Sequence, residues 1–95
     1  MKKTDKELAR EVIELIIKTL NITHVKPEDV SLDTPIFNGQ NELDLDSVDA
    51  IEIVVELQKA YGVRINDDLP VREILYSIRT IVDFLKKENA TEKIM

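Results

Sequence analysis

Residues 46–62 read DSVDAIEIVVELQKAYG, and this stretch predicts a helix with a defined start and a defined end. Asp46 is of a residue type whose side chain accepts hydrogen bonds from the N–H groups at a helix start. Gly62 tolerates the left-handed backbone conformation that often ends a helix. We therefore expect a helix that begins at Asp46-Ser47 and ends near Tyr61-Gly62.

The predicted helix has two apolar faces rather than one. At about 100° per residue, one face gathers the side chains expected in the core: Ala50, Ile53, Val54, Leu57 and Tyr61. The opposite face carries three aliphatic residues bordered by acids: Val48, Ile51 and Val55, beside Asp49, Glu52 and Glu56. A surface helix needs only one apolar stripe. The second stripe is therefore either covered by another part of the chain or offered to partners that are basic and partly apolar.

A helix from about Asp5 to Leu20 is predicted before this stretch. Thr4 and Glu7 match a capping box, in which each side chain accepts a hydrogen bond from the backbone of the other residue. Residues 21–45 keep no helical period and are rich in turn formers, so they predict a long connection with one short helical turn at 27–29. Connections of this length are uncommon and are often functional.

Two helices are predicted after it, a short one that opens at Pro70 and a last one with Ser77 as its N-cap. The expected fold class is all-α: a small four-helix bundle of three longer helices and one short helix, with a long loop between the first and second helices. A chain of 95 residues predicts one domain over residues 1–95. We expect about residues 4–87 to be folded and residues 88–95 to form a flexible tail.

Composition and charge argue against several classes of function. The net charge is −6, and only 4% of residues are aromatic, which is a poor composition for binding nucleic acid. No apolar run is long enough to span a membrane, and the start lacks the apolar region of a secretory signal, so a cytoplasmic protein is expected. With no cysteine and a single histidine, no metal site is predicted.

The acidic residues are concentrated in one part of the chain. No Lys or Arg lies between Lys26 and Lys59. Six acids in this interval carry a charge equal to the net charge of the whole chain: Glu42, Asp44, Asp46, Asp49, Glu52 and Glu56. This run is either a solvated helix face or a surface that attracts a basic partner.

Ser47 is poorly equipped to act as a catalytic nucleophile. The chain has no Gly-x-Ser-x-Gly elbow, and the only histidine, His24, is far away in sequence. The start of a helix presents free N–H groups and the positive end of the helix dipole, and both suit a phosphate ester. Ser47 is therefore a candidate for modification, and no catalytic residue is predicted.

The segment Asp46-Ser47-Val48-Asp49-Ala50-Ile51-Glu52 resembles the Asp-Ser-Leu-Asp-x-x-Glu signature of acyl carrier proteins. Flanking segments also resemble this family: residues 33–37, 53–57, 61–65 and 77–85. The resemblance implies that Ser47, beside Asp46, carries 4′-phosphopantetheine, which a phosphopantetheinyl transferase adds from coenzyme A. It also implies a non-catalytic carrier of acyl thioesters for fatty-acid, specialised lipid or polyketide-type biosynthesis.

The resemblance assigns the second stripe to partner enzymes that synthesise or transfer acyl groups. Asp49, Glu52 and Glu56 match family positions that meet basic patches on partners. Val48, Ile51 and Val55 match positions that touch partners or line the opening to the interior. Because no long apolar seam is left over, we expect a monomer.

The sequence departs from the family pattern before and after the serine. Asp44-Leu45 stands where the family usually has glycine, and Val48 stands where leucine is common. We interpret these departures as features of a specialised carrier. Two alternatives stay open: an aminoacyl or peptidyl carrier, and an acidic helical adaptor that binds a basic protein and carries no prosthetic group.

Overall fold

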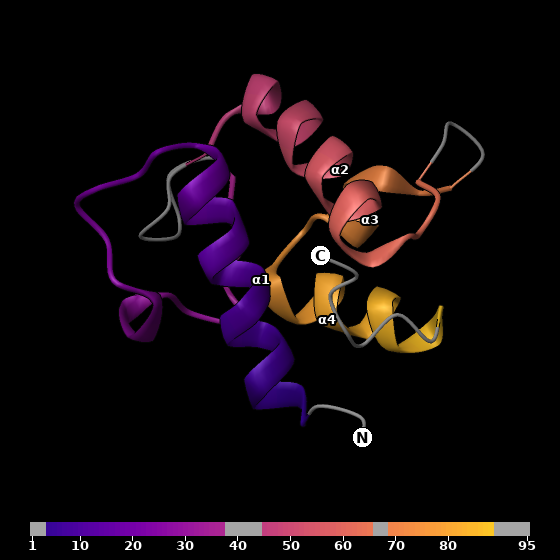
Figure 1. The fold of residues 1–95 in the computed structure, drawn as a ribbon, viewed down its shortest axis with the longest axis horizontal. Helices are drawn as coiled ribbons and strands as arrows, with labels where there is room; N and C mark the ends of the chain where they lie inside the picture. The colour runs from indigo at the N-terminus through magenta and orange to yellow at the C-terminus, as the bar shows by residue number, and fades with distance from the viewer. Residues whose placement is uncertain (1–3, 38–44, 66–68, 89–95) are drawn as a thin grey trace.

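A computed structural model describes residues 4–37, 45–65 and 69–88 (Figure 1). The described chain forms four α-helices and one 3₁₀ turn: α1 (Asp5–Thr19), η1 (Pro27–Asp29), α2 (Ser47–Tyr61), α3 (Val71–Ile74) and α4 (Ile78–Lys87). The predicted bundle of three longer helices and one short helix is confirmed. Of the predicted tail, Glu88 caps α4, and residues 89–95 lie outside the described residues.

Local sequence explains where the helices begin and end. At the start of α1, Thr4 Oγ1 accepts a hydrogen bond from the Glu7 N–H at 3.2 Å, and Glu7 Oε1 accepts one from the Thr4 N–H at 3.2 Å. Asp46 and Ser77 are the N-caps of α2 and α4, as predicted. Gly62 ends α2 with φ at 68°, a conformation that glycine adopts without a Cβ clash.

α1 is the helix around which the other elements pack. It contacts α2, α4 and η1, while α3 packs against α4. η1 lies beside α1, where the long connection passes along the outer side of the molecule (Figure 1). The buried residues of α1 are all aliphatic: Leu8, Ala9, Val12, Ile13, Leu15 and Ile16. Burial of such side chains is the main stabilising contribution to a bundle of this size.

A buried tyrosine joins the end of α2 to α1. The Tyr61 hydroxyl donates a hydrogen bond to Glu11 Oε1 at 2.7 Å. Burial and the adjacent Glu11 carboxylate raise the pKa of the Tyr61 phenol above its ordinary value, so the phenol stays protonated and remains a donor. Just beyond the helix, the Ile65 N–H donates to Gln58 Oε1 at 3.1 Å. These two bonds fix the C-terminal end of α2.

The long connection enters the core through Ile36. The Ile36 N–H donates to the Tyr76 carbonyl at 3.0 Å, and the Ile36 carbonyl accepts from the Leu45 N–H at 3.0 Å. The Ile36 side chain is 0% exposed. Next to it, Phe37 forms an isolated parallel bridge with Leu45. Ile36 therefore links the turn before α4 to Leu45, the residue that precedes Asp46.

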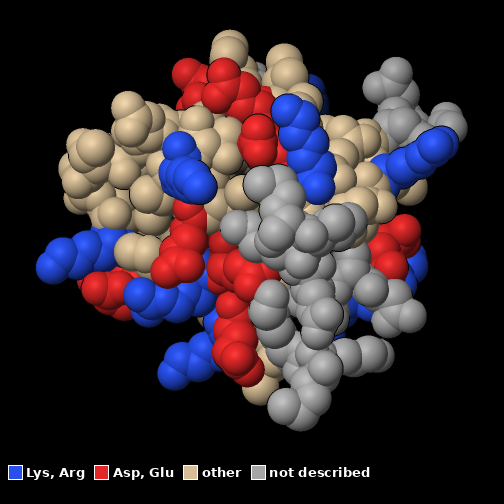
Figure 2. Space-filling view, viewed as in Figure 1, with Lys and Arg blue, Asp and Glu red and all other residues tan. Residues whose placement is uncertain are grey.

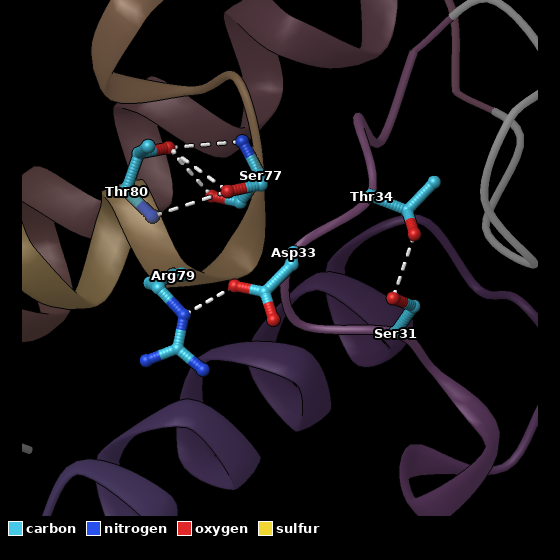
Figure 3. Close-up of polar contacts among 6 residues, drawn as sticks. All are labelled: Ser31, Asp33, Thr34, Ser77, Arg79 and Thr80. Carbon is cyan, nitrogen blue, oxygen red and sulfur yellow. Dashed lines mark hydrogen bonds and ion pairs between the residues drawn. The ribbon is translucent and has the colours of Figure 1, made fainter.

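A second attachment lies a few residues earlier in the connection. The Arg79 N–H donates to the Leu32 carbonyl at 2.9 Å, and Arg79 Nε forms an ion pair with Asp33 Oδ1 (Figure 3). The Asp33 carboxylate raises the pKa of the Arg79 guanidinium by hydrogen bonding and by charge. The hydroxyls of Ser31 and Thr34 share a hydrogen bond of 2.7 Å across the same turn. The connection is irregular in conformation, but its middle section is fixed to the start of α4.

We predict that Ile36→Ala lowers the free energy of unfolding by about 2–5 kcal/mol, because it removes a fully buried side chain and leaves a cavity. Ile51→Ala is the matched control, since Ile51 is 67% exposed, and we expect its effect to stay within about 0.5 kcal/mol. Urea unfolding followed by circular dichroism measures both. Equal losses in the two variants would contradict the central place of Ile36.

Candidate functional site

The first turn of α2 is held by two acidic side chains. Asp46 Oδ1 accepts hydrogen bonds from the Val48 N–H at 3.0 Å and from the Asp49 N–H at 3.1 Å. Asp49 Oδ2 accepts in return from the Asp46 N–H at 3.1 Å. This reciprocal capping box fixes the backbone on both sides of Ser47, the first residue of α2.

The expectation of free N–H groups at this helix start is wrong for two of them. The N–H groups of Val48 and Asp49 are both occupied by the Asp46 carboxylate. The physical reason is proximity, since a short acidic side chain at the N-cap reaches these donors before any external group does. A phosphate ester at this helix start would meet the positive end of the helix dipole, together with the carboxylates of Asp46 and Asp49.

Two of the three serines in the chain are engaged in local structure. Ser77 is buried, and its Oγ accepts a hydrogen bond from the Thr80 N–H at 3.3 Å. Ser31 is half-buried, and its hydroxyl is hydrogen-bonded to that of Thr34. Ser47 is the first residue of α2, after its N-cap, whereas Ser77 is itself the N-cap of α4 and is buried. Position in the fold thus distinguishes Ser47 from the other serines.

The surroundings of Ser47 fit a large hydrophilic substituent. The residue before it, Asp46, is exposed, and the residue after it, Val48, is 67% exposed. The chain is thus exposed on both sides of this position. The dipole of a 15-residue helix favours a negatively charged group here, and the backbone N–H donors of Val48 and Asp49 are already occupied.

The sequence left open whether the second apolar stripe of α2 is covered by another part of the chain or exposed. The structure shows that it is exposed. The exposed fractions are 67% for Val48, 67% for Ile51 and 41% for Val55. The opposite face is in the core, where Ile53 and Leu57 are buried. No segment of the described chain covers the three exposed side chains. The helix is therefore two-faced, with one face in the core and one face toward solvent.

The acids beside this stripe differ in what they already bind. Glu52 is exposed and Glu56 is half-buried, and neither forms an ion pair within residues 4–37, 45–65 and 69–88. Asp49 is half-buried and is engaged in the capping box. Acidic side chains gather over α2 at the top of Figure 2. Glu52 and Glu56 thus form no ion pair with the described residues, while Asp49 has a structural role that the sequence reasoning missed.

Sequence reasoning also missed the residues of the long connection that lead the chain into this site. Ile36 and Leu45 set the path of the chain into Asp46 through a backbone hydrogen bond. The available signal was an isoleucine inside a polar, turn-rich connection, where an apolar side chain indicates burial. Its hydrogen-bond partners could not be predicted, because backbone pairing between distant residues leaves no local pattern.

The described residues show neither a metal centre nor a membrane span. No three His, Cys, Asp or Glu side chains among them are arranged to hold an ion. No helix among them is both long and apolar enough to cross a bilayer. His24 is exposed in the long connection.

Comparison with known proteins finds similar chains. The profile of the family described as "Phosphopantetheine attachment site" matches residues 10–86. "Acyl carrier protein" from Lactobacillus johnsonii is 30% identical over 83 residues, which is 87% of this chain and 94% of that protein. "Acyl carrier protein 2, mitochondrial" from Arabidopsis thaliana is 36% identical over 76 residues, 79% of this chain and 56% of that protein. "Meromycolate extension acyl carrier protein" from Mycobacterium leprae is 30% identical over 87 residues, 90% of this chain and 70% of that protein.

We predict that Asp46→Ala lowers the free energy of unfolding by about 0.5–2 kcal/mol, because two N–H groups lose their acceptor. Asp46→Asn is the matched control, since asparagine caps a helix about as well without the charge. Urea unfolding of both variants measures the difference. If Asp46→Asn lost as much stability as Asp46→Ala, charge rather than capping would explain the role of Asp46.

Proposed function

This chain belongs to the phosphopantetheine attachment family of acyl carrier proteins, and we propose that Ser47 is the residue that carries its 4′-phosphopantetheine. The protein is a non-catalytic acyl carrier with that group as its cofactor. The observation that carries the proposal for Ser47 is its place as the first residue of the capped helix α2, between the exposed residues Asp46 and Val48. Ser47 also lies within the matched residues 10–86.

Attachment is a transfer reaction on the Ser47 hydroxyl. The Ser47 oxygen attacks the phosphorus that bears the pantetheine chain in coenzyme A, forming one O–P bond. The diphosphate bond of coenzyme A breaks, adenosine 3′,5′-bisphosphate leaves, and the hydroxyl proton passes to a base on the transferase. We assign this base to the transferase, because the carrier is non-catalytic. Once bound, the cofactor supplies a thiol that holds acyl groups as thioesters.

The exposed face of α2 is the proposed docking face for partner enzymes. Glu52 and Glu56, which form no ion pair with described residues, attract a basic patch and speed the encounter. Val48, Ile51 and Val55 supply a small apolar contact that fixes the register of the complex. Asp49 contributes charge at the same place while it completes the helix cap. The partners we propose are a phosphopantetheinyl transferase and enzymes that synthesise or transfer acyl groups.

The proposed pathway is specialised lipid or polyketide-type biosynthesis, with fatty-acid synthesis as the general case. Asp44-Leu45 before the serine and Val48 after it support this specialisation, because they change residues beside the attachment site. One relative is named for meromycolate extension and another as mitochondrial, so carriers of similar sequence bear different assignments. A cytoplasmic monomer remains our proposal for the location and the oligomeric state.

We predict that incubation with coenzyme A, magnesium and a broad-specificity phosphopantetheinyl transferase adds one phosphopantetheine unit to the protein. Intact mass spectrometry measures the gain. Ser47→Ala should show none and keep its helical circular dichroism, and Ser31→Ala should gain the unit like the wild type. A gain in Ser47→Ala would assign the wrong serine. No gain in the wild type, with a transferase that modifies a known carrier, would favour an unmodified acidic adaptor.

We predict that reversing Glu52 and Glu56 to Lys slows modification by the transferase at least about tenfold at low ionic strength, because charge steers the encounter. The matched control reverses Glu28 and Asp29 in η1, which gives the same change in net charge away from α2. The rate is measured as kcat/KM at increasing salt, which should shrink the difference by screening. Equal reductions of kcat/KM in the two double variants would contradict the proposed docking role of α2.

A further inference from the structure

The turn between α3 and α4 exposes one aromatic side chain. Tyr76 is 52% exposed, although the residues on both sides of it are buried: Ile74, Leu75, Ser77 and Ile78. The other large apolar residues that the described chain exposes are the three of the α2 docking face. An aromatic ring left in water on an otherwise buried segment points to a contact that the chain by itself does not make.

Hydrogen bonds link this turn to the chain that leads into α2. The Tyr76 carbonyl accepts from the Ile36 N–H, and the Leu45 N–H donates to the Ile36 carbonyl, each at 3.0 Å. Since Ile36 makes both bonds, the Leu45 nitrogen and the Tyr76 oxygen lie within about 10 Å of each other. Ser47 is two residues beyond Leu45, which adds at most about 7 Å. A long substituent on Ser47 can therefore reach the turn.

Hydrogen bonds fix the backbone before and after Tyr76. Thr80 Oγ1 accepts from the Ser77 N–H at 2.9 Å and donates to the Ile74 carbonyl at 2.9 Å. Arg79 is joined to Asp33 across the connection, as Figure 3 shows beside the Ser77–Thr80 contacts. A contact made by a side chain on a fixed backbone loses little conformational entropy on binding.

We propose that the ring of Tyr76 binds the 4′-phosphopantetheine arm carried by Ser47, an inference that rests on the proposed function. The arm contains a gem-dimethyl group, which packs on an aromatic ring, and amide groups, which hydrogen-bond to a phenol. This contact holds the arm along the surface between the α2 start and the α3–α4 turn while no partner enzyme is bound.

The test is an isotope-filtered NOE experiment on the full chain. The protein is labelled with ¹³C and loaded with unlabelled coenzyme A, so that cross-peaks from the arm methyl protons to protein protons report direct contacts. We expect cross-peaks to the ring of Tyr76 and none to the ring of Tyr61, which is buried beside Glu11 and serves as the internal control. Intact mass confirms complete loading of the same sample.

Two variants make the assignment specific. In Tyr76→Ala the arm methyl resonances should shift toward their positions in free coenzyme A, and in Tyr76→Phe they should stay near the wild-type positions. Because Tyr76 is exposed, neither change disturbs the core. Full loading without cross-peaks to Tyr76, or unchanged methyl resonances in Tyr76→Ala, would overturn the inference alone. Absence of loading would overturn the inference and the proposed function together.

Discussion

The paired hydrogen bonds of Ile36 are the constraint on which the rest of the structure depends. A long connection must satisfy its backbone polar groups wherever it enters the core. Ile36 does so with one N–H bond toward the turn before α4 and one carbonyl bond toward Leu45. Its side chain fills the core at the same point. Asp46 determines the residue at which α2 begins, and the Ile36 bonds fix where in the molecule the chain enters α2.

The features that sequence predicted correctly all have local causes. The caps at Thr4, Asp46 and Ser77 and the left-handed Gly62 depend on residue type within a few positions. The two faces of α2 follow from helix geometry, which is why the exposed stripe was predictable as an alternative to a covered one. Tertiary hydrogen bonds were not predictable, because the partners of Ile36 and Tyr61 come from distant parts of the chain.

The acidic residues of the candidate site fall into two groups, those that cap α2 and those without ion pairs in the described chain. Asp46 and Asp49 use their carboxylates to hold the first turn of α2, while Glu52 and Glu56 stay without ion pairs in the described chain. The expectation of free N–H donors failed because the cap is completed within the chain. Such a division suits a carrier, whose fold must keep an attached group at a fixed start and leave one face open for successive enzymes.

The most direct test of the account is to locate the modification on the wild-type chain by fragmentation mass spectrometry. No Lys or Arg lies between Lys26 and Lys59, so trypsin leaves Ser31 and Ser47 on one peptide, and fragmentation must separate them. The account predicts that the whole phosphopantetheine mass resides on Ser47. Its presence on Ser31 or Ser77 would contradict the assignment of the α2 start as the attachment site.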